Sequence, residues 1–189
     1  IAYDATTYAH RTVFENTGGF SPAALSPDGR WLVLDKALTS ANNDLYLVDL
    51  TAPGEPKLLT PHEGNVAYTA FDFTPDSKAV LIGTDQNGEF QQAIRHDLAS
   101  GANTPLIQAD WDVSFVFYSP SGRYRVSGLN ADAKTELTLL DATTGQPVAM
   151  TGLPDGDIGN VRFSEDEKTI AFTVSSDTSP ADVLSLIHI

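Results

Sequence analysis

The chain has 189 residues, of which 41% are hydrophobic, and its 14 Gly and 11 Pro favour many short strands over long helices. The formal net charge of −14 would repel a phosphate backbone or an anionic membrane surface, so we expect no nucleic acid partner. No apolar run approaches the roughly 20 residues that span a bilayer, so no membrane span is expected. The absence of Cys excludes disulfides and thiolate metal sites.

A short turn motif recurs four times along the chain. Residues 26–30 read Ser-Pro-Asp-Gly-Arg, and related copies follow at 74–78, 119–123 and 164–168. Their starts are 48, 45 and 45 residues apart, close to the ~40–50 residues of one four-stranded propeller blade. Pro presets the first corner of such a turn, Asp or Ser bonds back to the backbone, and Gly supplies a positive φ. Each copy therefore predicts a tight turn between two strands.

Apolar segments of strand length flank every turn, with aromatic and β-branched enrichment. Those before the turns are residues 20–25, 68–73, 113–118 and 158–163, and those after are 31–36, 79–84, 124–129 and 169–174. Third segments end at Asp49, Asp97 and Asp141, and short fourth strands are expected at 57–60, 105–108 and 147–150. Each repeat thus predicts four strands joined by hairpin turns.

The fold predicted from this pattern is an all-β β-propeller fragment with about three complete four-stranded blades and a partial blade at each end. The complete blades cover about residues 17–62, 63–109 and 110–153, and the partial blades cover 1–16 and 154–183. In the first partial blade, residues 1–4 should end a third strand and residues 11–14 should form a fourth. In the last, a third strand should start near Val183. An open arc of a larger ring fits these ends better than closure into four blades.

The last six residues stand apart from this propeller fragment of residues 1–183. Residues 184–189 read Leu-Ser-Leu-Ile-His-Ile, which resembles the translated mosaic end of a transposase used to prepare sequencing libraries. We therefore expect residues 184–189 to be a sequencing-adapter artefact, to be left out of the fold. The alternative is a genuine apolar strand, because the run could pair as one.

The repeat turn, followed by Asp-Leu-Tyr-Leu-Val-Asp-Leu at residues 44–50, resembles the propeller repeats of two groups. One is the prolyl oligopeptidase family of serine peptidases, which includes dipeptidyl and acylaminoacyl peptidases. The other is the TolB-like group of the periplasm. The resemblance extends to Val183, and two longer phrases at residues 14–20 and 171–183 are similar to segments of the peptidases.

The resemblance to the peptidases implies a non-catalytic, substrate-gating propeller that caps an α/β-hydrolase domain missing from this chain. That domain would act on peptides by Ser-His-Asp acyl transfer, while the propeller admits peptides and excludes folded proteins. The resemblance to TolB implies instead a binding module for protein–protein interaction with no enzymatic activity. A third hypothesis is that the chain is a structural repeat in a larger surface protein. The resemblance favours a periplasmic or otherwise exported protein and leaves compartment and oligomeric state open.

No catalytic residue is predicted within the chain. The nearest match to a Gly-x-Ser-x-Gly nucleophile elbow, residues 19–23, lacks the last Gly and has Pro22 directly after Ser21. None of the four His has a second His two or four residues on, so no metal ion and no cofactor are expected.

Acidic residues precede two of the repeat turns at fixed distances. Nine and seven residues before the turn lie Asp110 and Asp112 in one blade, and Asp155 and Asp157 in the next. These positions should lie at one mouth of the central channel, where carboxylates could attract a peptide amino group or hold Ca²⁺. Solvated turn acids with no specific role are the simpler reading. Trp111 could contact substrate at the mouth or pack between blades. These five residues are the candidate substrate-binding site.

Overall fold

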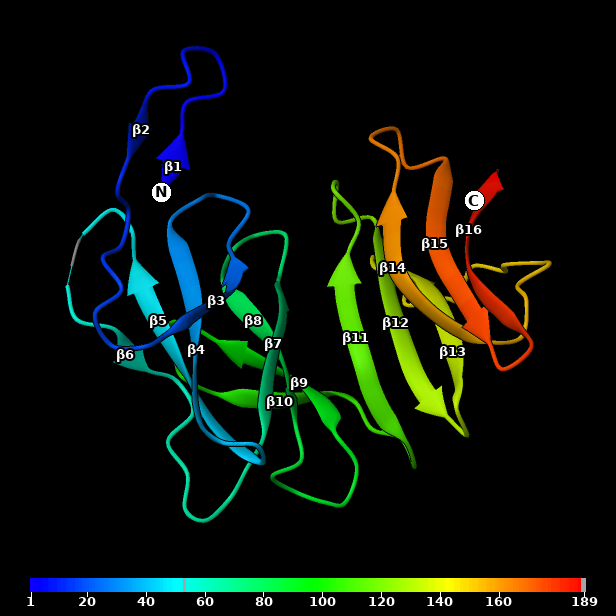
Figure 1. Cartoon of the computed structure of the whole chain (residues 1–189), viewed down its shortest axis with the longest axis horizontal. Helices are drawn as coiled ribbons and strands as arrows, with labels where there is room; N and C mark the ends of the chain where they lie inside the picture. Colours follow the sequence, from blue (N-terminus) through cyan, green and yellow to red (C-terminus); the bar gives the residue numbers. More distant parts are fainter. Residues whose placement is uncertain (53, 188–189) are drawn as a thin grey trace.

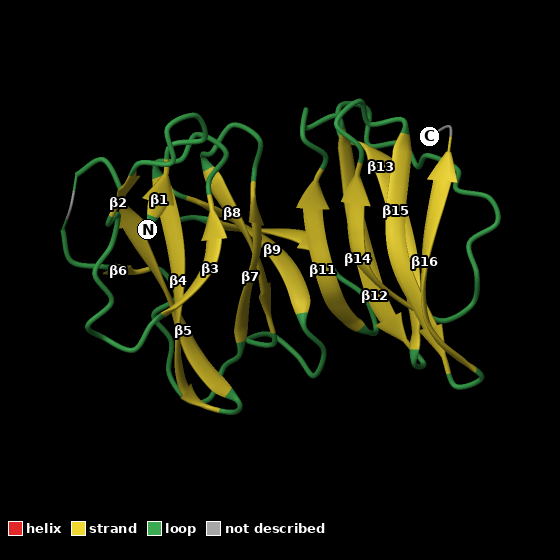
Figure 2. Cartoon of the chain, turned by 45° about the horizontal axis from the view of Figure 1, so that its top comes forward, coloured by secondary structure: helices red, strands yellow, loops and turns green. Residues whose placement is uncertain are grey.

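The structure is a computed structural model that describes residues 1–52 and 54–187. Within those residues the chain forms sixteen strands in five antiparallel sheets and no helix (Figures 1 and 2). No segment of the described chain is therefore a helix of the length and apolarity that crossing a membrane requires.

Each sheet is a meander in which a strand pairs with its neighbour in sequence. The first two sheets are β1 (Ala2–Tyr3) and β2 (His10–Arg11), then β3 (Ser21–Leu25), β4 (Trp31–Thr39), β5 (Asn42–Asp49) and β6 (Lys57–Leu58). The third is β7 (Tyr68–Phe73), β8 (Ala79–Thr84), β9 (Gln92–Asp97) and β10 (Asn103–Ile107). The last two are β11 (Asp112–Tyr118), β12 (Tyr124–Ala131) and β13 (Lys134–Asp141), then β14 (Asp157–Phe163), β15 (Thr169–Ser176) and β16 (Ser179–Ile187).

The predicted all-β propeller fragment is confirmed, and β7 and β8 have the predicted bounds. The third blade differs in its fourth strand, which is reduced to a single bridge between Leu140 and Pro147. Pro147 has no N–H to donate, and the bonds on either side of it are from the Asp141 N–H to the Gln146 carbonyl at 2.9 Å and from the Val148 N–H to the Leu139 carbonyl at 2.8 Å. The sheets form an open arc, with β1 and β2 at one side of Figure 1 and β16 at the other.

The last strand begins earlier than the sequence pattern indicated, at Ser179 rather than near Val183. It runs beside β15 as far as Ile187, which is opposite Thr169. Residues 184–187 thus pair as a strand, as the alternative reading of the tail requires, and residues 188–189 lie outside the described part of the chain. The adapter origin of residues 184–189 stays a prediction.

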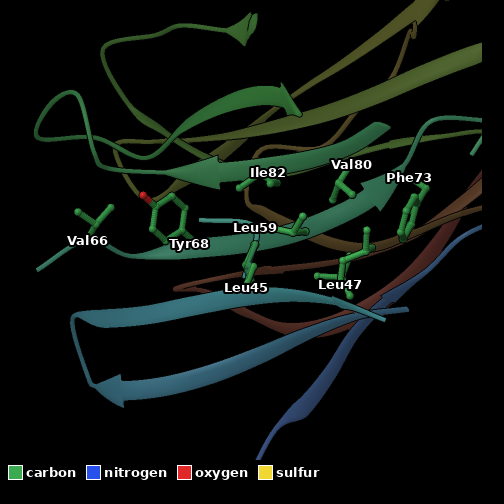
Figure 3. Close-up of a cluster of buried hydrophobic side chains, with 9 residues drawn as sticks. Leu45, Leu47, Leu59, Val66, Tyr68, Phe73, Val80 and Ile82 are labelled. Carbon is green, nitrogen blue, oxygen red and sulfur yellow. The ribbon is translucent and has the colours of Figure 1, made fainter. Parts of the chain in front are cut away.

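The core lies between the sheets, in three layers. The layer between the second and third sheets contains Leu45 and Leu47 from β5 opposite Val80 and Ile82 from β8 (Figure 3). Similar layers lie on either side of β11–β13. Burial of one such side chain contributes ~1.5–3 kcal/mol, so the packing of neighbouring blades stabilises the arc.

Every innermost strand of the four larger sheets is interrupted by a register shift. The shifts lie between Pro22 and Ala24, Ala70 and Asp72, Val113 and Phe115, and Gly159 and Arg162. A bulge increases the local twist of a strand and re-aims its side chains. In the second and third blades, the bulge lies at or beside a phenylalanine whose ring is close to a glycine of the next strand. A Cβ at Gly83 or Gly128 would lie 2.5 Å from the ring of Phe71 or Phe115.

The four repeat turns contact one another along one end of the blades. The Asp28 N–H donates to the Ser77 hydroxyl at 3.2 Å, which joins the first turn to the second. The Pro75 ring lies against Gly122 of the third turn. The Ser121 N–H and hydroxyl donate to the Glu167 carboxylate of the fourth turn at 2.5 and 2.8 Å. The fourth position of the second, third and fourth turns therefore faces the preceding blade.

Candidate functional site

The candidate mouth of the channel lies where the innermost strands begin, and there each blade is hydrogen-bonded to the one before it. The Gln91 N–H donates to the Asp112 carboxylate at 2.6 Å, and the Gln91 side-chain amide donates to the Val113 carbonyl at 2.8 Å. The Val113 N–H returns a bond to the Gln91 carbonyl at 2.8 Å. Asp112 is thus half-buried and fastens the start of β11 to the preceding blade.

The same arrangement recurs at the next boundary with different side chains. The Ile158 N–H donates to the Thr135 hydroxyl at 2.9 Å, and that hydroxyl lies 2.9 Å from the Asp157 carboxylate, to which it donates. The Thr135 N–H donates to the Gly156 carbonyl at 3.0 Å. Asp157 therefore occupies the position of Asp112 one blade further on.

At the boundary between the β3–β6 sheet and the β7–β10 sheet, Asn43 has the role that Gln91 and Thr135 have at the two later boundaries. The Tyr68 N–H donates to the Asn43 side-chain oxygen at 2.7 Å, and the Asn43 amide donates to the Tyr68 carbonyl at 2.8 Å. Three different side chains thus join three pairs of blades, all from the start of a third strand. A polar residue that can both donate and accept suits this position, because two backbone groups of the next blade face it.

Asp157 is itself exposed, as are the remaining candidate residues. Asp110 is exposed, and the Asp155 side chain is 90% exposed with its carboxylate 3.3 Å from the Lys134 ammonium. Trp111 is 42% exposed, and its ring centroid lies 5.9 Å from that of Phe90 in the preceding blade. The arrows of β11 and β14 point the same way in Figure 1, so the two acidic segments lie at the same end of their blades.

The acidic residues at this end do not converge on a common point. Within residues 1–52 and 54–187, no three His, Asp or Glu side chains are placed to hold a metal ion. What the arrangement provides is two separate exposed carboxylates, Asp110 and Asp155, beside two that join blades, Asp112 and Asp157.

The residues considered for nucleophilic chemistry have structural surroundings. Ser21 begins β3 and pairs with Asp35, so it lies in a sheet and not at a strand–turn–helix elbow. The His62 ring nitrogens lie 2.9 Å from the Thr60 carbonyl and 2.8 Å from the Asn42 side-chain oxygen. His96 is buried and lies 2.7 Å from Asn103. His188 lies outside the described residues.

A cavity near the repeat turns was not anticipated from the sequence. It has a volume of about 530 Å³ and is formed by the ends of β7, β11 and β14, the innermost strands of three successive blades. Its wall includes Phe71, Phe115, Phe117, Asp72 and Arg162. In the sequence each of these residues belonged to a predicted strand, and only the abundance of aromatic residues on those strands marked them.

Asp72 is the carboxylate in this wall. Its oxygens accept the N–H groups of Phe73 at 2.8 Å and of Tyr118 at 3.4 Å, the second from the neighbouring blade. Burial raises the pKa of Asp72 above the ordinary value for an aspartate, and the two hydrogen bonds only partly offset this effect.

Successive antiparallel meanders packed face to face, with their innermost strands joined blade to blade, define the chain as part of a β-propeller. In a comparison with protein families, residues 10–186 match the family model of the prolyl oligopeptidase N-terminal beta-propeller domain. The chain therefore belongs to the prolyl oligopeptidase family, as a part of its propeller domain. A search among curated protein sequences found no match.

Solved structures of two kinds share this fold. TolB from Acinetobacter baumannii has 21% identity and a TM-score of 0.66, over 97% of this chain and 45% of its own. A structure from work on two prolyl endopeptidases has 20% identity and a TM-score of 0.71, over 93% and 26%. Prolyl oligopeptidase B from Galerina marginata, bound to a 35mer hydrolysis and macrocyclization substrate, has 18% identity and a TM-score of 0.70, over 93% and 26%. The chain spans less than half the length of these proteins.

Proposed function

We propose that this chain is the substrate-gating propeller of a serine peptidase of the prolyl oligopeptidase type, which acts on peptides through an α/β-hydrolase domain outside these residues. The observation that carries the proposal is the match of residues 10–186 to the propeller domain of that family. The propeller itself takes no part in bond cleavage. Its role is to restrict access to the catalytic domain by size.

The start of the innermost strands is the proposed mouth for the incoming peptide. The exposed carboxylates of Asp110 and Asp155, in a chain of net charge −14, attract the peptide amino group by their field. The exposed face of Trp111 offers an apolar surface beside them. Asp112 and Asp157 contribute by holding neighbouring blades together at this end, which keeps the width of the mouth constant.

The alternative is a TolB-like binding propeller of the cell envelope, with a protein partner and no enzymatic activity. The observation in its favour is the alignment of 97% of this chain with the Acinetobacter TolB structure. Both readings favour a periplasmic or otherwise exported protein, and both use a surface of the same propeller.

One experiment separates the two functions. The complete product of the gene that contains this segment is expressed and exposed to a fluorophosphonate probe, then to a short peptide and to a folded protein containing the same cleavage sequence. A peptidase is labelled at one Ser and cleaves the peptide but not the folded protein. An unlabelled product without a Gly-x-Ser-x-Gly elbow would establish the binding module instead.

A further inference from the structure

The cavity between β7, β11 and β14 combines an aromatic wall with the guanidinium of Arg162. Phe115 and Phe117 lie side by side on β11 with ring centroids 6.1 Å apart. Phe117 meets Phe163 of the next blade edge to face, at 6.4 Å and 75°. These rings are only partly buried in the core, so part of each faces the cavity of about 530 Å³. That volume is in the range of sites that hold a small ligand or a few residues of a peptide.

Arg162 supplies the cation at the edge of this aromatic wall. It is exposed, and one of its terminal amino groups donates to the Val161 carbonyl at 2.8 Å. This bond anchors the guanidinium and leaves its other N–H groups for a ligand. Among the described residues no carboxylate lies within ion-pair distance of Arg162, although the chain has 25 acidic residues against 11 basic ones.

Asp72, the one carboxylate among the described residues of the cavity wall, forms no ion pair with Arg162. Asp72 turns its oxygens to the backbone N–H groups of Phe73 and Tyr118, and its burial favours the uncharged form. The Arg162 guanidinium is therefore left unpaired by the described residues of the cavity wall and can pair with a ligand. A guanidinium with several free N–H groups is suited to hold a carboxylate by paired hydrogen bonds.

The geometry points to a binding site for the C-terminal end of a peptide, with the terminal carboxylate on Arg162 and an aromatic last side chain against Phe115, Phe117 and Phe163. An aromatic side chain fits because offset and edge-to-face ring pairs add stabilisation beyond the area they bury. A free carboxylate is required because it is the ligand group that pairs with the guanidinium. The site thus recognises the C-terminus of a peptide. It lies where the innermost strands finish, whereas Asp110 and Asp155 lie where these strands begin.

The inference takes from the proposed function only that the occupant is a peptide. Its test is direct binding to the purified 189-residue chain, with acetyl-Ala-Ala-(4-fluorophenylalanine) as the probe and ¹⁹F NMR line broadening as the readout. The same peptide with a C-terminal amide is the first comparison. Unlabelled acetyl-Ala-Ala-Phe and acetyl-Ala-Ala-Ala are then used as competitors.

We expect the free acid to bind and the amide to bind at least about fivefold more weakly, because a charge-assisted pair at an exposed site is lost. R162Q should reduce affinity for the free acid by a similar factor and leave affinity for the amide unchanged. R11Q is the matched control, because it removes the same charge on β2, far from the cavity in sequence and outside its wall. It should leave both affinities unchanged.

Acetyl-Ala-Ala-Phe should compete at least about fivefold better than acetyl-Ala-Ala-Ala, since only the former fills the aromatic wall. Equal binding of acid and amide, equal competition by the two peptides, or an effect of R11Q as large as that of R162Q would each overturn the inference. A thermal melt of both variants establishes that they fold as the parent does. If the full-length product cleaves peptides but the 189-residue chain binds the free acid no better than the amide, this site is refuted and the proposed function stands.

Discussion

The carboxylate of Glu167 accepts hydrogen bonds from both the N–H and the hydroxyl of Ser121, at 2.5 and 2.8 Å, across the boundary between two blades. Glu167 occupies the turn position that Gly29 and Gly122 occupy in other repeats, and it has a φ of 55°. The fourth copy of the turn, Ser-Glu-Asp-Glu-Lys at residues 164–168, lacks both the Pro and the Gly of the first copy. In the structure its departure from glycine is compensated by a bond to the neighbouring turn.

Replacing Glu167 by Gln should lower the free energy of unfolding at pH 7 by about 1 kcal/mol, because the amide accepts from Ser121 more weakly than the carboxylate does. The measurement is urea denaturation of the chain and its variant. E165Q is the control, since Glu165 is an exposed acid of the same turn. An equal loss in both variants would show that the bond to Ser121 contributes nothing.

The same pair predicts a pH dependence. Burial opposes the ionisation of Glu167, but the hydrogen bonds from Ser121 outweigh it, so the pKa of Glu167 in the folded chain lies below the ordinary value of 4.5. The stabilisation is therefore present above pH 4.5 and is lost as the pH falls through the folded pKa. The difference in stability between the parent and E167Q should be constant from pH 7 to about pH 5 and shrink below it. A difference that grows on acidification would contradict this assignment.

Gly122 should tolerate alanine less well than Gly145 does. Both have a positive φ, 78° and 70°, so alanine is strained at either position. A Cβ at Gly122 would also lie 2.6 Å from Cγ of Pro75 in the preceding blade, whereas a Cβ at Gly145 meets no atom within 4 Å. We expect G145A to cost about 1 kcal/mol of unfolding free energy and G122A about 1–3 kcal/mol more. Equal costs of G122A and G145A in thermal or urea unfolding would mean that the turn of Gly122 does not contact the turn of Pro75.

Asp112 should matter for stability and Asp110 should not. D112A leaves the Gln91 N–H without its acceptor at a half-buried boundary, for an expected loss of about 1–2 kcal/mol. D110A removes an exposed side chain and should change the unfolding free energy by no more than about 0.5 kcal/mol. Urea denaturation of the two variants side by side is the measurement, and a larger loss in D110A would overturn this division of roles.

The proposed mouth is tested in the complete protein. Neutralising Asp110 and Asp155 together by Asn should raise KM for a peptide with a free amino group about two- to fivefold at low salt, with kcat unchanged. The effect should fade as ionic strength rises, because exposed charges are screened. E55Q is the control, as Glu55 is a similar acid outside this segment. An N-acetylated peptide that responds as strongly as the free one would rule out attraction of the amino group.

The purified 189-residue chain should be inert towards peptide p-nitroanilides and should not react with a fluorophosphonate. The physical reason is that Ser21 lies in a sheet, and none of the His side chains in the described segments is hydrogen-bonded to it. Mass spectrometry of the probe-treated chain is the measurement. A covalent adduct on any Ser would show a nucleophile that the structure does not explain.

The sequence by itself determined the repeat, the turns and the order of the strands between them. These features depend on local chemistry: Pro and Gly preset turn dihedrals, and β-rich apolar segments mark strands, so β7 and β8 could be predicted to the residue. The fourth strand of the third blade shows the limit, because the structure reduces it to a single bridge between Leu140 and Pro147.

Only the tertiary structure decided what each polar residue contacts. The bonds of Gln91 to Asp112 and of Ser121 to Glu167 join different blades, over 21 and 46 residues of sequence. Phe71 and Arg162 lie two repeats apart in the sequence, in β7 and β14, and line the same cavity. A local pattern carries no information about such contacts, because they arise from the packing angle between sheets and from bulges that re-aim side chains. Asp110 and Asp112, two residues apart in the same segment, therefore have different surroundings, the first exposed to solvent and the second bonded to the neighbouring blade.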